Sequence, residues 1–203
     1  MNVMDAIQKR RSIRHYKPDD IPDEVLNRLL EAMRLAPSGG NGQEWKFIVV
    51  RDKTTKAKVA DACQYEIVSG AINPQKWIHE APVVLVACAS EKEAAYRFYR
   101  EGEVIIGYGG SLQAELEKAP IEYESVLMFD LAIALDHLSL VAIDEGLGTC
   151  WIGGMNEHKM KEILSIPDDV RAPVAMVLGY PDESPDPRPR KTLDEIICYD
   201  KYC

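Results

Sequence analysis

Basic side chains gather in two short segments near opposite ends of the chain. The first reads Arg10-Arg11-Ser12-Ile13-Arg14. In an extended segment side chains alternate, so Arg10, Ser12 and Arg14 face one way. Arg11 and Ile13 then face the other way. Two guanidinium groups and a hydroxyl on one face suit a phosphate, because planar guanidinium donors bind its oxygens in pairs. The segment predicts a phosphate site, with a basic turn in solvent as the alternative.

The second basic segment is Arg188-Pro189-Arg190-Lys191. Its prolines keep the backbone extended and place Arg188 and Arg190 on a common side. The whole chain has 24 Lys and Arg against 33 Asp and Glu, a formal net charge of −9. This balance argues against a nucleic-acid binder or a polybasic membrane-surface protein. Two basic clusters in an acidic protein suggest one shared anion, although the second could also be a solvated tail.

Two glycine-containing segments could bring backbone close to a flat ligand. Residues 37–45 read Pro-Ser-Gly-Gly-Asn-Gly-Gln-Glu-Trp, and their Asn41 and Gln43 offer hydrogen-bond donors and acceptors. Alone, this segment could simply connect a helix to a strand. Residues 146–154 read Gly-Leu-Gly-Thr-Cys-Trp-Ile-Gly-Gly. They are no dinucleotide fingerprint, because they follow a helix and have Trp151 where a third glycine is required.

Hydrophobic periodicity predicts the elements that position these segments. We expect helices over residues 3–11, 22–36, 53–63, 126–145 and 156–164, and strands over 45–50, 82–89, 149–152 and 173–178. The helix over 126–145 is apolar almost all round, so it should be buried within the chain or at a subunit interface. The pattern predicts one three-layer α+β domain over residues 1–203, whose proline-rich tail ends in a short apolar element that meets a neighbouring subunit.

Other sequence features exclude further classes. The N-terminus lacks a signal peptide and no apolar stretch is long enough to cross a bilayer, so we expect a cytoplasmic protein without a membrane segment. The five cysteines include no Cys-x-x-Cys pair, which favours free thiols over a disulfide framework or a metal cage. The four histidines lack ligand spacing, so no metal site is expected.

In this order the segments resemble the nitroreductase family of FMN enzymes. The family has an Arg-Arg-Ser-x-Arg-like phosphate segment, then Pro-Ser-x-x-Asn-x-Gln-Pro-Trp, then Gly-Leu-Gly with a Trp-x-Gly-Gly-like turn, and a closing Arg-x-Arg pair. This chain departs from the pattern at Glu44, where the family usually has proline. A further match is Asn73-x-x-Lys76, just before the strand at 82–89. The resemblance covers residues 2–89 and 126–200, and residues 90–125 match no part of the family pattern.

The resemblance implies a three-layer α/β/α fold with a mostly antiparallel sheet, and a homodimer whose subunits share each FMN site. Basic residues of one subunit would bind the phosphate, and the partner's loop at 37–43 would line the flavin. The Gly153 N–H would face flavin N5. Lys76 would stabilise the reduced, anionic flavin at its pyrimidine end. The implied cofactor-binding residues are Arg10, Arg11, Ser12, Arg14, Pro37, Ser38, Gly39, Asn41, Gln43, Asn73, Lys76, Ile152, Gly153, Gly154, Arg188 and Arg190.

The implied activity is ping-pong hydride transfer from NAD(P)H, through flavin N5, to a nitroaromatic, a quinone or a similar small electrophile. The cofactor carries this chemistry, so no catalytic side-chain acid or base is expected. Residues 90–125 would form a lid over the flavin, or else a peripheral helical excursion. The alternatives are another branch of the superfamily, dehalogenating or flavin-fragmenting, and an FMN-binding sensor or store without turnover. An anion-binding scaffold without flavin is a third.

Overall fold

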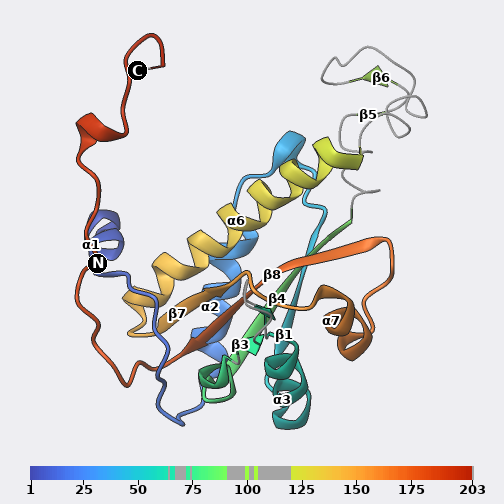
Figure 1. Ribbon diagram of the computed structural model, residues 1–203, viewed down its shortest axis with the longest axis vertical. Coiled ribbons are helices and arrows are strands. Elements are labelled where there is room, and N and C mark those ends of the chain that lie inside the picture. Colours follow the sequence, from blue (N-terminus) through green and yellow to red (C-terminus); the bar gives the residue numbers. More distant parts are fainter. Residues whose placement is uncertain are drawn as a thin grey trace.

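A four-stranded antiparallel sheet lies at the centre of the protein in the computed structural model (Figure 1). Its strands lie in the order β1, β4, β8, β7, and each neighbouring pair is antiparallel. They span Trp45–Val50 (β1), Val83–Ser90 (β4), Gly148–Ile152 (β7) and Val170–Gly179 (β8). The structure describes residues 1–63, 65–66, 72–73, 75–90, 99–100, 103–104 and 120–202. The side chains at 65–66, 72–73, 76, 99–100, 103–104 and 120–126 lie outside this description.

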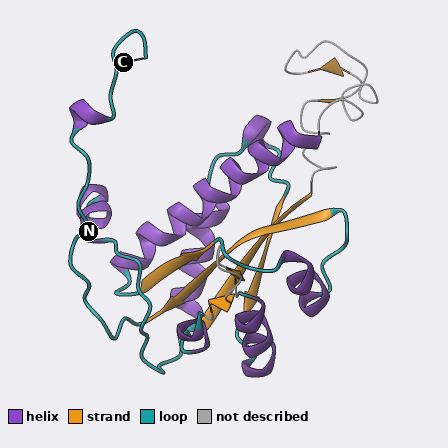
Figure 2. Cartoon of the chain, viewed as in Figure 1, coloured by secondary structure: helices purple, strands orange, loops and turns teal. Residues whose placement is uncertain are grey.

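Helices cover both faces of the sheet (Figure 2). One face carries α2 (Asp23–Arg34) and α6 (Pro120–Asp144), and the other carries α3 (Lys53–Ala62) and α7 (Glu157–Leu164). Successive residues of β4 point to opposite faces, so Leu85 joins the core beneath α2 and α6 while Val86 joins the core beneath α3 and α7. The predicted three-layer α+β fold with an antiparallel sheet is confirmed.

The other described elements are short. They are α1 (Val3–Lys9), the 3-10 turns η1 (Gly39–Asn41), η2 (Lys76–His79) and η3 (Leu193–Glu195), and the strands β2 (Tyr65–Glu66), β3 (Ile72–Asn73), β5 (Tyr99–Arg100) and β6 (Glu103–Val104). Strand β2 pairs with β3, and β5 pairs with β6. The expected lid over residues 90–125 falls almost wholly outside the described residues, so it stays a prediction.

Helix α6 is the longest described element, and it begins earlier than the expected residue 126. Leu131, Leu135 and Leu138 on its inner face are fully buried, whereas Phe129 is 67% exposed and Ile133 is 38% exposed. The single chain therefore covers one face of this helix and leaves apolar side chains on the other. None of the helices among the described residues is long and apolar enough to span a membrane.

The chain after β8 is a long tail that is loop except for η3 (Figure 2). Thr192 and Glu195 form a capping box that starts this turn, so the short element expected near the C-terminus is confirmed. Leu193 is 72% exposed and Ile196 is 57% exposed. The tail passes α1 and ends away from the sheet (Figure 1). Its apolar side chains thus lie uncovered in the single chain.

Three of the five cysteines are buried free thiols, namely Cys63, Cys88 and Cys150. Burial raises the pKa of Cys63 to about 12, and it raises the pKa of Cys88 to about 11. Cys198, in the exposed tail, is disulfide-bonded. The expectation of free thiols is wrong at this position, because it depended on the absence of Cys-x-x-Cys and did not address wider spacings.

Glu157 joins the start of α7 to β8. Its carboxylate receives two hydrogen bonds from the Arg171 guanidinium, at 2.9 and 3.1 Å, and one from the Ala172 N–H at 2.7 Å. Burial favours a raised pKa, but these donors outweigh it and hold the Glu157 pKa below its ordinary value. A carboxylate with a depressed folded-state pKa stabilises the fold above its unfolded pKa, and that stability is lost as pH falls through the folded pKa.

We therefore expect Glu157→Gln to lower the free energy of unfolding by about 1–3 kcal/mol at neutral pH, because a charged acceptor is lost. The loss should shrink as pH falls below 4.5, the ordinary glutamate pKa, towards the depressed pKa of Glu157. Urea unfolding at neutral and at acidic pH measures both quantities. Glu162→Gln, on the exposed side of the same helix, is the matched control. An equal loss at both pH values would contradict this assignment.

Candidate anion-binding site

Residues 12–17 run between β7 and the first residues of the tail. Ser12 forms a parallel bridge with Thr149, and the Ile13 N–H donates to the Thr149 carbonyl at 3.0 Å. On the other side Tyr16 forms an antiparallel bridge with Pro181. The buried Tyr16 hydroxyl donates to the Ile13 carbonyl, and burial raises its pKa well above the ordinary value. These contacts hold the N-terminal basic segment extended and bring the tail beside it.

Gly148, at the start of β7, permits this close approach. A Cβ at this position would lie 2.5 Å from Cγ1 of Ile13, closer than side chains can pack. Gly148 therefore serves chain packing next to the basic segment, whereas Gly146 has a positive φ of 72° and open space around it. At the other end of the segment, the space around Gly153 is also open.

A cavity of about 430 Å³ lies where the two basic segments meet. It is lined by Ile7, Gln8, Arg10, Arg11, Ser12, Arg14, Pro185, Asp186, Pro187, Arg188 and Arg190. All six of the residues expected to bind a phosphate are among them. Guanidinium groups separated by about 175 residues of chain thus line one hollow, which we call the arginine cavity.

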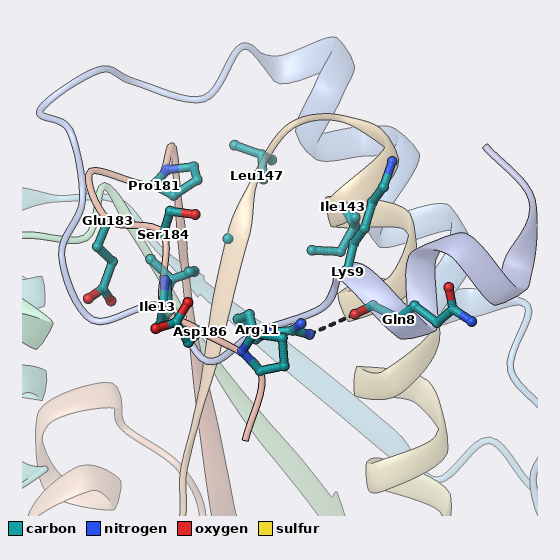
Figure 3. Close-up of a pocket in the computed structure, with 13 residues that line it drawn as sticks. Gln8, Lys9, Arg11, Ile13, Ile143, Leu147, Pro181, Glu183, Ser184 and Asp186 are labelled. Carbon is teal, nitrogen blue, oxygen red and sulfur yellow. Dashed lines mark hydrogen bonds between the residues drawn. The ribbon is translucent and has the colours of Figure 1, made fainter. Parts of the chain in front are cut away.

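A second cavity of about 430 Å³ adjoins the arginine cavity and shares five lining residues with it (Figure 3). Ile13 lines only this second cavity, Ser12 and Arg14 line only the arginine cavity, and Arg11 lines both. The expected alternation of side chains is therefore present. Asp186 lines both cavities, and Glu183 adds a second carboxylate to the second one only.

Arg11 supports the end of α1 as well as lining both cavities. Its Nη1 donates to the Gln8 carbonyl (Figure 3) and to the Arg10 carbonyl, each at 2.7 Å. Cationic side chains at a helix C-terminus donate hydrogen bonds to the last carbonyls, which have no partner within the helix. Its Nε is buried and has no hydrogen-bond partner within the described part of the chain. One N–H of this guanidinium is thus enclosed by the protein without an acceptor among the described residues.

The arginines of the cavity differ from those elsewhere on the surface. Arg28, Arg34 and Arg51 each pair with a carboxylate. Among the described residues, no carboxylate forms an ion pair with Arg10, Arg14, Arg188 or Arg190. The Arg14 guanidinium instead lies 5.9 Å from the centre of the Trp77 ring. The cavity therefore gathers five arginines against one acidic residue, Asp186, and a phosphate dianion fits its donor set.

The loop at residues 37–43, which is expected to line a flavin, does not contribute to the arginine cavity. Gly40, Asn41 and Gln43 have positive φ angles of 56°, 56° and 51°. The Ser38 hydroxyl accepts the Gln43 N–H at 3.1 Å, and the Gly39 N–H donates to the Asp130 carboxylate at 3.1 Å. The loop is thus folded on itself and attached to α6. Glu44, the departure from the family pattern, is buried at its end.

The loop and the N-terminal basic segment lie near opposite ends of α6 (Figure 1). Asp130 contacts the loop, while Asp144 accepts a hydrogen bond from the N-terminal ammonium at 2.8 Å. With a rise of 1.5 Å per residue, these two carboxylates lie about 21 Å apart along the helix. One chain therefore does not bring Pro37, Ser38, Gly39, Asn41 and Gln43 to the arginines.

The turn after β7 is the third part of the predicted site. The space beyond Gly153 is open, since a Cβ there would meet no atom within 4 Å. The Gln75 amide donates to the Gly154 carbonyl at 3.1 Å and to the Cys63 carbonyl at 2.7 Å. It thereby ties the turn to the residue next to Lys76. The side chains of Asn73 and Lys76 lie outside the described residues, so their roles stay predictions.

The fold and the cavity define an α+β protein with an arginine-lined cavity where residues 10–14 meet residues 185–190 at the edge of an antiparallel sheet. The family model described as Nitroreductase family matches residues 7–180. The chain therefore belongs to the nitroreductase family.

Similar proteins cover nearly the whole chain. An "NADH dehydrogenase" of Thermus thermophilus is 31% identical over 209 residues, covering 98% of this chain and 96% of the relative. An "FMN reductase [NAD(P)H]" of Bacillus subtilis is 31% identical over 98% of this chain and 74% of its own length. The crystal structure of a nitroreductase family protein from Clostridium novyi is 33% identical, with a TM-score of 0.68 over 96% of this chain and 91% of that one.

Proposed function

We propose that this protein is an FMN-dependent oxidoreductase that uses NAD(P)H to reduce a nitroaromatic, a quinone or a similar small electrophile. Membership of the nitroreductase family supports this activity, as do relatives whose names specify NADH or FMN. The observation that carries the proposal is the arginine cavity. It unites basic residues from both ends of an acidic chain, as a phosphate-bearing cofactor requires.

In this proposal the FMN phosphate lies in the arginine cavity. Arg10, Arg14, Arg188 and Arg190 supply paired donors, Ser12 supplies a hydroxyl, and the buried Nε of Arg11 supplies a further N–H. When bound, FMN supplies hydride uptake and release at N5. Ile152 and Gly153 would offer backbone at the ring edge because the space beside Gly153 is open. Asn73 and Lys76 would meet the pyrimidine end.

The proposal includes a homodimer in which each FMN site is shared by both subunits. The separation of the 37–43 loop from the arginine cavity supports this arrangement, because one chain cannot supply both to one flavin. The exposed apolar side chains of Phe129, Ile133, Leu193 and Ile196 also suit burial against a second copy. The tail would then pack on the partner subunit.

The proposal predicts a yellow protein that oxidises NADH or NADPH faster when a nitroaromatic or menadione is added. The test records the visible spectrum, identifies the released chromophore and measures turnover against free FMN as the control. If the protein binds FMN but oxidises NAD(P)H no faster than free FMN does, the alternative of an FMN-binding sensor or store is favoured. A colourless preparation that takes up no FMN would contradict the proposal.

A further inference from the structure

Glu183 holds the tail against the N-terminal basic segment. Its Oε1 accepts the backbone N–H of Arg14 and, at 3.2 Å, that of His15. One residue earlier, the Asp182 N–H donates to the His15 carbonyl at 2.9 Å. Carboxylates form stronger hydrogen bonds with backbone N–H groups than neutral acceptors do. Glu183 is therefore a strong link between the tail and the residues that carry Arg14.

Glu183 is also the last such link before the second basic segment. Within the described part of the chain, no hydrogen bond ties residues 184–191 to any other segment. Arg188 and Arg190 nevertheless line the same cavity as Arg10 and Arg14. Their position opposite the first segment therefore depends on where the tail is fixed, a few residues upstream at Glu183.

Glu183 does not line the arginine cavity. It lines the second cavity instead, beside Pro181 and Ser184 (Figure 3). A negative charge near a phosphate opposes its binding, so charge alone gives no advantage at this position. What Glu183 contributes is a hydrogen-bond acceptor for two backbone groups of the first basic segment.

We propose that Glu183 is a positioning residue for the cofactor phosphate. By accepting the N–H groups of Arg14 and His15, it fixes the tail so that Arg188 and Arg190 face Arg10 and Arg14 across one cavity. This inference rests on the proposed function. Beyond that function, the inference states that selectivity for a phosphorylated flavin depends on an acidic residue that does not contact the phosphate.

The test compares FMN with riboflavin, which has the same ring and ribityl chain but no phosphate. Affinities are measured by flavin fluorescence on the full chain freed of bound flavin. We expect Glu183→Ala to weaken FMN binding about tenfold, equivalent to one misplaced charge-assisted contact, and to leave riboflavin binding unchanged. Glu183→Gln should keep FMN affinity, because its amide oxygen still accepts. Asp182→Ala, which removes the neighbouring charge but keeps the backbone contact, is the matched control.

Each other outcome is informative. An increase of FMN affinity in both Glu183 variants would show a purely electrostatic role and overturn the inference. An equal loss for FMN and riboflavin in Glu183→Ala would show general packing and overturn it as well. In an Arg188→Ala/Arg190→Ala background, Glu183→Ala should lower FMN affinity little further, and a full additional loss would overturn the inference. If Glu183→Ala does not fold, Glu183→Asp replaces it, and an unchanged FMN preference would overturn the inference. A wild-type protein that does not prefer FMN would instead contradict the proposed function.

Discussion

Replacing Arg14 by alanine should weaken FMN binding by about 1.5–3 kcal/mol, which corresponds to roughly 10-fold to 150-fold in the dissociation constant. Arg14 lines the arginine cavity, and its guanidinium has no carboxylate partner among the described residues. Its interaction with Trp77 restricts where the guanidinium can point. The variant thus loses a partly pre-oriented, charge-assisted contact with the phosphate. Fluorescence titration with FMN measures the change, and riboflavin affinity should stay constant.

Two further variants separate this contact from general charge effects. Arg34→Ala removes the same charge from α2, where Arg34 pairs with Glu31 at 2.6 Å, and should leave FMN binding unchanged. Arg14→Lys keeps the charge but loses the planar pair of donors, so it should give an intermediate affinity. If Arg14→Ala weakens FMN binding no more than Arg34→Ala does, the arginine cavity does not bind the phosphate.

The positions of the helices and strands in the described layers could be predicted from the sequence, because periodicity and helix-capping residues are local signals. Asn156 accepts the Lys159 N–H and begins α7 as expected. The sequence predicts the C-terminal end of α1 less accurately. The helix ends at Lys9 rather than near Arg11, since the Arg11 guanidinium satisfies the terminal carbonyls from outside the helix. Such capping by a later side chain leaves no periodic pattern.

The basic residues of the site could be found in the sequence, because arginine has a distinctive chemistry at any position. The residues that position them could not. Glu183 contacts backbone N–H groups up to 169 residues away, and Asp130 contacts the Gly39 N–H across 91 residues. Gln75 likewise binds two carbonyls. A side chain that binds distant backbone groups does not require any particular residue type at the partner position. No spacing or motif in the sequence therefore indicates such a contact.

The proposed sharing of each site by two subunits leads to a prediction about mixed dimers. Arg14→Ala alters the arginine cavity, and Asn41→Asp alters the loop expected to line the flavin of the other subunit. Asparagine and aspartate both tolerate the positive φ of 56° found at position 41, so the second variant should fold. Each variant alone should show little NADH oxidation. A heterodimer of the two has one doubly altered site and one intact site.

Co-expression of the two variants should therefore restore activity. If subunits pair at random, half of the dimers are heterodimers with one intact site of two, giving about one quarter of wild-type activity. Two different affinity tags allow the heterodimer to be purified and measured alone. The matched control mixes Arg14→Ala with Arg188→Ala. Both residues line the same cavity of one chain, so no intact site forms and no activity should return. Recovery in that control, or none in the first mixture, would show that the cavity and the loop do not come from different subunits.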